Sequence, residues 1–369
     1  MSNAVGPQTS ETGPRASEAS PRVAETMRAM WCERPQAVEL RQIRVHPVGD
    51  EDVLVRVAYA AICPWDVRAY SGLSAVAFPR ILGHEVSGTV AAVGGKVKNL
   101  AIGQPVAPDM ILKCGTCRAC RSGRSNRCQR PTFLQYGGGY ADYVVVPQRN
   151  IHLIPDGTSL KAAALMEPLA CVLRGQDMLR LSPGETELVV GLGPIGLMHM
   201  QVARAFGARV IASDPLPERL ELARRLGADF TVNPTVTDLG QTIKDLTDGW
   251  GVDAVALTVG SARMVEETVR YLAPGGRLNI FAGIYPKEQV QLDPNQIHYG
   301  EWVITGSSDS TPENMHRALT LIATGQVETE ALVSHVFPLA ELAQGFDMVK
   351  NRAGHKILIE VNPAPVGGG

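Results

Sequence analysis

A glycine-rich turn, set between an apolar segment and a helical one, restricts the fold of this chain more than any other feature. Gly191-Leu192-Gly193-Pro194-Ile195-Gly196 follows a predicted strand at 187–190 and opens a predicted helix at 194–206. In such a turn the first glycine permits the tight bend, the second lets the backbone approach a pyrophosphate, and the third lets the helix pack closely. The unpaired N–H groups of the helix N-terminus would face the phosphate charge. The turn therefore predicts a dinucleotide site that includes Pro194 and Ile195.

The residue that ends the next predicted strand, at 208–213, indicates which dinucleotide binds. Asp214 lies 18 residues after Gly196, where a carboxylate can accept hydrogen bonds from both hydroxyls of the adenosine ribose. A 2′-phosphate at that place would be repelled, so Asp214 favours NAD over NADP. Arg219 could weaken this preference, or it could pair with solvent or with Asp214. We also assign Val259 to the cofactor site.

The segments around the turn alternate between strand and helix. Further strands are predicted at 253–258 and 277–282, with a helix at 217–226. This alternation is typical of a doubly wound parallel sheet. The first part of the chain instead indicates a β-rich, irregular domain, with predicted strands at 53–57, 86–93 and 141–146. A last strand is predicted at 356–360.

The length of 369 residues suits two domains. Residues 1–26 hold almost no large apolar side chain, so we expect a disordered tail there. The net charge of −2 favours neither nucleic acid nor an acidic membrane as a partner. Neither an apolar run of about 20 residues nor a signal-peptide core occurs, so we expect a cytoplasmic protein.

Four of the seven cysteines lie close together, at Cys114, Cys117, Cys120 and Cys128. Four thiolates in a compact loop can fill all positions of a tetrahedral zinc ion, which makes a closed, structural site. An iron–sulfur cluster is the alternative ligand. We place the lobe that holds this site at 113–130.

A second set of metal ligands is dispersed along the chain: Cys63, His84, Glu85 and Glu167. One thiolate, one imidazole and one carboxylate can bind zinc and leave a fourth position open. An open position on zinc lowers the pKa of a hydroxyl that binds there. The residues therefore predict a catalytic metal.

Three motifs, in this order, resemble those of the zinc-dependent medium-chain alcohol dehydrogenases. They are Gly83-His84-Glu85-Val86-Ser87-Gly88 with Gly94, the four-cysteine lobe, and the turn at 191–196. The resemblance covers roughly residues 27–362 and implies an α/β protein in which a Rossmann domain (178–315) is inserted in a GroES-like catalytic domain (27–177 and 316–362). Residues 363–369 would form a tail. The resemblance also implies two zinc ions per chain, NAD, and a homodimer or homotetramer.

Within the family, Met166-Glu167-Pro168-Leu169 is similar to the sorbitol and polyol dehydrogenases. The resemblance implies reversible oxidation of a secondary alcohol, as in a polyol, cyclitol or sugar alcohol, to a ketone. Amino-alcohol dehydrogenation, of the threonine or aminocyclitol type, is the alternative, and a non-catalytic relative is a remote one. Either Glu85 or Glu167 would complete the metal site, with Cys171 as a further candidate.

The sequence departs from the family after the metal cysteine, where Cys-x-Ser/Thr-Asp is usual. Trp65 replaces the hydroxyl residue, and Arg68 stands where a relay histidine is often found. An indole only donates and a guanidinium stays charged, so neither can pass a proton. Either zinc-bound water and a glutamate or another group would then handle the proton, and Glu167 is the candidate for proton transfer or for exchange with water on the metal. We expect Trp65 to narrow or floor the substrate pocket. Asp66 would orient the metal ligands.

One lysine near the end of the chain has two predicted environments. Lys356 opens the last predicted strand. It would either reach the cofactor pyrophosphate or remain solvated at the strand end.

Overall fold

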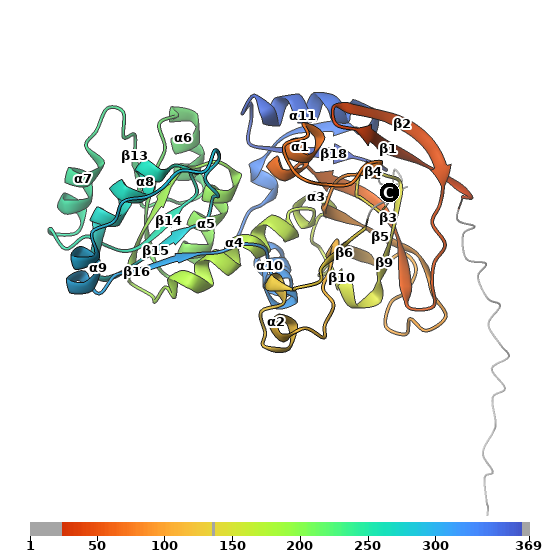
Figure 1. Ribbon diagram of the computed structural model, residues 1–369, viewed down its shortest axis with the longest axis horizontal. Coiled ribbons are helices and arrows are strands. Elements are labelled where there is room, and N and C mark those ends of the chain that lie inside the picture. Colours follow the sequence, from red (N-terminus) through yellow and green to blue (C-terminus); the bar gives the residue numbers. More distant parts are fainter. Residues whose placement is uncertain (1–23, 135–136, 364–369) are drawn as a thin grey trace, which may run out of the picture.

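The computed structural model describes residues 24–134 and 137–363. It consists of two lobes, one built on a six-stranded sheet and the other rich in β-strands, with α4 (Met166–Leu179) and α10 (Pro312–Ala323) between them (Figure 1). The predicted tails lie outside the described residues except at their inner ends, where β1 begins at Thr26. Over the described residues, no helix combines the length and the apolar character that a membrane span needs.

The six-stranded sheet is parallel throughout, with the strand order β13-β12-β11-β14-β15-β16. Its members are β11 (Thr186–Val190), β12 (Arg209–Ser213), β13 (Phe230–Val232), β14 (Val252–Leu257), β15 (Leu272–Ile280) and β16 (Val303–Gly306). All five residues of β11 are buried, as expected for a strand that helices cover on both faces. The order reverses beside β11, so the crevice for a ligand lies at the carboxyl end of that strand.

Two hydrophobic cores cover the two faces of this sheet. Val189 of β11 packs with α4, α5 (Pro194–Ala205) and α10, whereas its neighbour Leu188 packs with α7 (Leu239–Leu246) and α8 (Ala262–Thr268). The alternation follows from the strand period of two. The remaining helices beside this sheet are α6 (Pro217–Arg225) and α9 (Pro294–Gly300).

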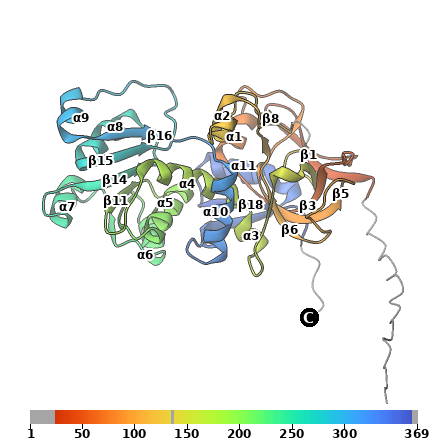
Figure 2. The same ribbon diagram turned by 90° about the horizontal axis from the view of Figure 1, so that it is seen from below.

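The β-rich lobe joins segments from both ends of the chain. A seven-stranded sheet has the order β10-β6-β5-β3-β18-β17, with β9 also paired to β3. Its strands are β3 (Asp52–Ala61), β5 (Glu85–Val93), β6 (Pro105–Pro108), β9 (Tyr143–Pro147), β10 (Ile151–Leu153), β17 (Val333–Pro338) and β18 (Lys356–Glu360). Since β18 pairs antiparallel with β3, the last strand completes the sheet begun near the start (Figure 2).

Smaller elements surround this sheet. A three-stranded sheet has the order β2-β1-β4 and a two-stranded one joins β7 and β8. These elements are β1 (Thr26–Arg34), β2 (Ala37–Arg44), β4 (Arg80–Ile81), β7 (Ile111–Leu112), β8 (Thr132–Phe133), α1 (Pro64–Tyr70), α2 (Arg118–Arg121), α3 (Leu160–Ala163) and α11 (Leu342–Lys350).

The predicted strands and helices are confirmed, with shifts at their ends. β15 begins at Leu272, five residues before the predicted start at 277, and β9 begins two residues after the predicted start at 141. The helices α4 and α10 continue across the predicted domain boundaries at 177/178 and 315/316. Boundaries are hard to read from sequence because a helix that packs on both sides of a junction has no break there.

A buried acid in β11 makes the stability of this lobe depend on pH. Glu187 is fully buried and its carboxylate accepts hydrogen bonds of 2.8 and 3.1 Å from the Gln176 side chain. Burial raises the pKa of Glu187 from 4.5 to about 8. Between these values the folded chain holds a proton that the unfolded chain has released, so stability falls as pH rises through this window.

We therefore expect Glu187→Gln to stabilise the protein at pH 8 by on the order of 2 kcal/mol. The gain should shrink as the pH is lowered toward 5, because both side chains are then neutral. Urea unfolding at several pH values measures it, with the exposed Glu313→Gln as control. A constant difference between Glu187→Gln and the parent chain would contradict the expectation.

Candidate active site

The start of α1 fixes the position of Cys63. Cys63 is the N-cap of this helix, and its Sγ accepts a hydrogen bond of 3.4 Å from the Trp65 backbone N–H. In return, Asp66 Oδ2 accepts one of 3.2 Å from the Cys63 backbone N–H. This reciprocal pair is a capping box, so the thiol is held by the same interactions that begin the helix.

Asp66 also orients His84. Its Oδ1 lies 3.3 Å from His84 Nδ1, while Tyr140 donates a hydrogen bond of 3.0 Å to Oδ2. Asp66 is fully buried. Burial alone would lower the pKa of His84, but the nearby charges of Asp66 and Cys63 raise it well above its usual value. With Nδ1 occupied by the carboxylate, Nε2 is the nitrogen that a metal can take.

The structure brings together one thiol, one imidazole and one carboxylate. Ligand atoms of Cys63, His84 and Glu85 all lie within 4.8 Å of one another. Glu85 is buried and its two carboxylate oxygens lie 2.8 and 2.5 Å from Lys356 Nζ. Lys356 also donates a hydrogen bond of 3.1 Å to the Ile62 carbonyl.

The solvated environment predicted for Lys356 is therefore wrong. Lys356 is 5% exposed, and its ammonium is engaged by Glu85 rather than left free for a pyrophosphate. The register of the sheet causes this, because Ala61 of β3 pairs with Leu358 of β18 on one side and with Glu85 of β5 on the other, so the starts of β18 and β5 lie near the same end of β3.

Glu167 lies in the first turn of α4, outside the group formed by Cys63, His84 and Glu85. It accepts a hydrogen bond of 3.3 Å from Cys171 Sγ, and both residues line a cavity with His84. Burial raises the pKa of Glu167 to about 7. The structure thus separates the two candidate carboxylates, with Glu85 beside the Cys–His pair and Glu167 on the cavity wall.

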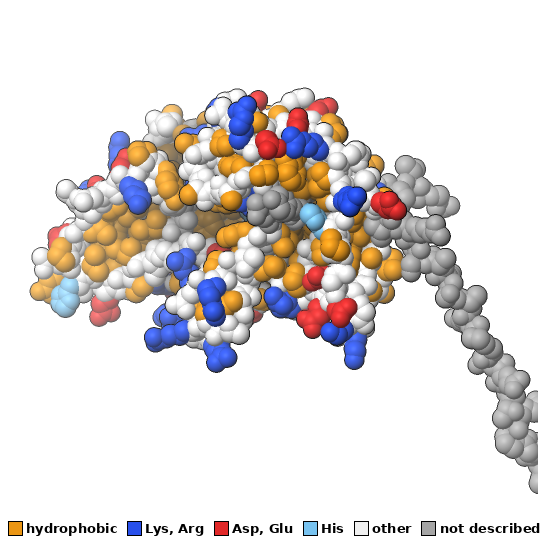
Figure 3. Space-filling view, turned by 45° about the vertical axis from the view of Figure 1, so that its right-hand side comes forward, with side chains coloured by type: hydrophobic (Ala, Val, Ile, Leu, Met, Phe, Trp, Pro, Cys, Tyr) orange, Lys and Arg blue, Asp and Glu red, His pale blue; other side chains and the backbone are white. Residues whose placement is uncertain are grey.

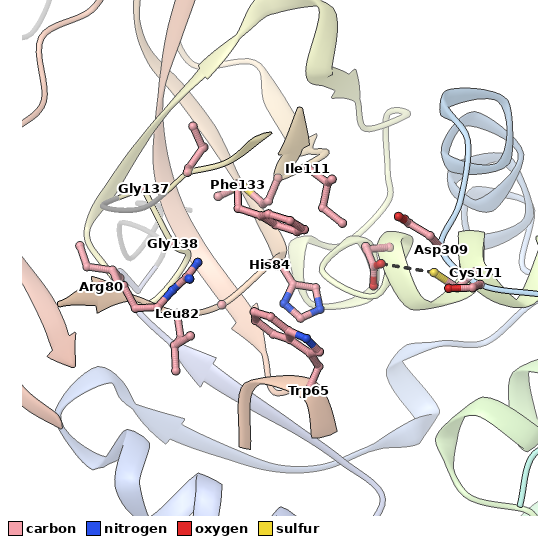
Figure 4. A pocket seen from close by; sticks show the side chains of 16 residues that line it. Trp65, Arg80, Leu82, His84, Ile111, Phe133, Gly137, Gly138, Cys171 and Asp309 are labelled. Carbon is pink, nitrogen blue, oxygen red and sulfur yellow. Dashed lines mark hydrogen bonds between the residues drawn. The ribbon is translucent and has the colours of Figure 1, made fainter. Parts of the chain in front are cut away.

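The cavity has a volume of about 350 Å³ and is mainly apolar. Trp65 and His84 lie near its centre in Figure 4, with ring centroids 5.6 Å apart in an edge-to-face arrangement. Trp65 forms part of the wall, and its predicted narrowing of the substrate pocket remains a prediction. Arg68 lies farther out, with its guanidinium 5.0 Å from the centroid of the Tyr285 ring. Sequence reasoning missed Asp309, Phe133 and Arg80, which also line the cavity, because each comes from a loop or short strand without a motif.

The glycine turn has the geometry that the sequence predicts. Gly191 has a φ of +88°, which favours glycine, and Gly193 is the N-cap of α5. A Cβ on Gly196 would lie 1.8 Å from the carbonyl oxygen of Gly191, so only glycine fits. Val259 lies beside Gly191, where its side chain would contact a Cβ at that position.

Asp214, the residue that follows β12, supports this turn. Its carboxylate accepts hydrogen bonds of 2.7 Å from Leu192 N–H and 2.9 Å from Leu216 N–H. Arg219 Nη1 lies 3.3 Å from Asp214 Oδ2, which confirms the possibility that Arg219 pairs with Asp214. The predicted binding to ribose remains a prediction.

One cleft joins the turn to the metal-ligand residues. Pro194, Ile195 and Thr258 line it together with Cys63 and His84. Thr258 was not predicted; its hydroxyl donates to the carbonyl groups of Val190 and Gly191, at 2.9 and 2.8 Å. A dinucleotide on the turn and a metal on Cys63 and His84 would therefore share one space.

The four-cysteine lobe forms a separate cluster. Ligand atoms of Cys114, Cys117, Cys120 and Cys128 lie within 4.8 Å of one another. Backbone N–H groups point at the sulfurs, as from Cys117 to Cys114 Sγ at 3.4 Å. Hydrogen bonds from the backbone of Thr116 and Cys117 lower the pKa of Cys114 to about 5, which favours the thiolate. Figure 3 shows Lys and Arg side chains along the lower edge of the molecule, where α2 lies in Figure 1.

Comparison with known proteins gives matches over most of the chain. Residues 49–156 match the family described as alcohol dehydrogenase GroES-like domain, and residues 194–324 match zinc-binding dehydrogenase. D-arabitol-phosphate dehydrogenase of Enterococcus avium is 33% identical over 87% of this chain and 93% of its own length. L-threonine 3-dehydrogenase of Thermococcus kodakarensis is 32% identical over 88% and 93%, respectively. A zinc-binding dehydrogenase from Sinorhizobium meliloti 1021, solved with NADP, has a TM-score of 0.86 and 32% identity, over 92% of this chain and all of its own.

Proposed function

Because this chain belongs to the zinc-dependent medium-chain alcohol dehydrogenase family, and is thus an oxidoreductase acting on CH–OH groups, we propose that it oxidises a secondary alcohol of a polyol, cyclitol or sugar alcohol to a ketone with NAD. The observation that carries the proposal is the shared cleft. Cys63 and His84 face the same space as Pro194 and Ile195 of the glycine turn. A hydroxyl carbon held beside the metal ligands would therefore lie next to a nicotinamide.

The side chains present fit both groups. Sulfur, nitrogen and carboxylate donors suit zinc at Cys63, His84 and Glu85, and the four thiols suit a closed zinc site. When bound, the metal supplies Lewis acidity toward the alcohol oxygen and the dinucleotide supplies the hydride acceptor. Asp66 keeps His84 in the orientation that presents Nε2, and Lys356 balances the charge of Glu85.

NAD is proposed over NADP because of Asp214. Its carboxylate is held at the end of β12 by two backbone N–H groups, which fixes a negative charge beside the turn. A 2′-phosphate there would meet like charge. Arg219 contacts the same carboxylate and could weaken this preference. Titration of the protein with NAD and with NADP therefore measures the preference directly.

Glu167 is the proposed proton acceptor. Trp65 and Arg68 cannot relay a proton, and Glu167 is a carboxyl group on the cavity wall. Burial raises its pKa to about 7, close to the ordinary working pH. Its proton would come from the substrate hydroxyl and leave through the cavity mouth.

The rate of alcohol oxidation should therefore fall as the pH drops below about 7, where Glu167 becomes protonated. Glu167→Gln should lower kcat by about 100-fold and remove this acid limb. Rates measured from pH 5.5 to 9, with Glu313→Gln as control, test both points. An unchanged acid limb in Glu167→Gln would assign it to another group.

A panel of substrates tests the proposed function itself. Zinc-loaded protein is mixed with NAD and polyols, cyclitols or amino alcohols, and the nicotinamide absorbance is followed. Turnover of polyols supports the proposal. Preferred turnover of amino alcohols would favour the second candidate, for which the acidic Glu167 and Asp309 on the cavity wall are the supporting observation. No turnover of any secondary alcohol would refute both.

A further inference from the structure

Arg80 is a buried cation that the proposed reaction does not use. It lies in β4 and is 9% exposed. Its Nε is buried without a hydrogen-bond partner, and the described part of the chain gives its guanidinium neither an ion pair nor a hydrogen bond. Leaving a buried charged group without partners is costly, so a ligand is the natural partner.

The side chain points into the substrate cavity. Figure 4 shows the guanidinium of Arg80 directed inward, on the side away from Cys171 and Asp309, with Trp65 and His84 between. The cavity is thus polarised, with acidic groups at one end and a cation at the other. A substrate that places its reacting hydroxyl near His84 would extend its far end toward Arg80.

A second arginine lies beside the same wall. An adjoining hollow shares Trp65, Arg80 and Phe133 with the cavity and is also lined by Arg68. Among the described residues that line this hollow there is no Asp or Glu. The acidic groups whose charge reaches Arg80 are Asp66, which is already bound to His84 and Tyr140, and Cys32, which lies opposite Arg80 in β1. The described residues that line this outer end of the site therefore contribute two cations, Arg68 and Arg80, and no carboxylate.

We propose that Arg80 binds an anionic terminal group, a phosphate ester or a carboxylate, on the polyol substrate. The inference rests on the proposed function, whose substrate class it narrows. The planar guanidinium matches both groups because each offers two oxygens to its parallel N–H bonds. Arg68 adds longer-range attraction at the cavity mouth.

Matched substrates test the inference. The values of kcat/KM are compared for a pentitol and its terminal phosphate monoester, and for a hexitol and the corresponding hexonate. We expect one anionic member to exceed its neutral partner by about 10-fold or more, and the favoured pair identifies phosphate or carboxylate. Arg80→Met should lower kcat/KM for that substrate by about 30- to 100-fold, mainly through KM, and change the neutral one less than about 3-fold. Arg80→Lys should fall between, and the exposed Arg149→Met should behave like the parent chain.

Two results would overturn the inference. One is equal or better use of the neutral polyols by the parent chain. The other is an equal loss for both members of a pair in Arg80→Met, which would mean that Arg80 acts on the fold around Asp66.

Binding separates this inference from the proposed function. If no alcohol is oxidised, the proposed function fails, but either the pentitol phosphate or the hexonate should still raise the melting temperature of the NAD-loaded parent chain. Loss of that shift in Arg80→Met would support anion binding. Absence of the shift in the parent chain with both anions would overturn it.

Discussion

Replacing Cys63 by serine should remove one of two zinc ions per chain and lower kcat/KM roughly a thousandfold, since the Lewis acidity of a catalytic metal supplies several kcal/mol. Serine retains a hydrogen-bond acceptor at the N-cap of α1, so the helix should persist. What is lost is the thiolate beside His84 and Glu85. Metal analysis and steady-state rates on the same preparation measure both effects.

The matched control is Cys32→Ser. Cys32 is also buried, but it lies in β1 and lines neither the cavity nor the cleft. This variant should keep both zinc ions and its activity. Full turnover by a Cys63→Ser preparation of low zinc content would contradict the assignment of Cys63.

The second large effect is expected at the glycine turn. Gly196→Ala should weaken NAD binding by on the order of 100-fold, because relieving a backbone overlap costs about 3 kcal/mol. The added Cβ would lie 1.8 Å from the carbonyl oxygen of Gly191, which has to move and open the turn. Isothermal titration with NAD gives the affinity, and thermal unfolding gives the stability.

Gly193→Ala is an instructive comparison for that variant. A Cβ there meets no atom within 4 Å, so the folded chain should keep its stability. The NAD affinity should nevertheless fall, because the methyl group would occupy the space of the pyrophosphate. Equal stability of the two variants would contradict the packing role given to Gly196.

The sequence predicts those parts of the site that local geometry determines. The turn at Gly191 depends on neighbouring residues, so its motif indicates its structure directly. Lys356 is a residue whose environment local sequence does not determine. Its environment depends on which strand β18 joins, and a strand sequence does not specify its partner over such a separation.

Arg80 and Tyr140 are two further residues whose place in the site could not be predicted from the sequence. Neither belongs to a motif, yet Tyr140 supports Asp66 and Arg80 faces the cavity. Both positions result from loops and short strands brought together by long-range packing. Residues brought together by long-range packing form no local motif. The sequence therefore predicts the metal ligands but not the residues that line the substrate end of the pocket.

The pairing of β18 with β3 also orders events during synthesis on the ribosome. Chains emerge from their N-terminus, and β3 leaves the ribosome long before β18. Until that last strand arrives, Glu85 lacks the ammonium of Lys356 and would be a lone buried anion beside Cys63 and His84. The parallel sheet, whose strands lie between, is able to fold first. The pair formed by Glu85 and Lys356 can therefore be completed only after the strands of the parallel sheet have been synthesised.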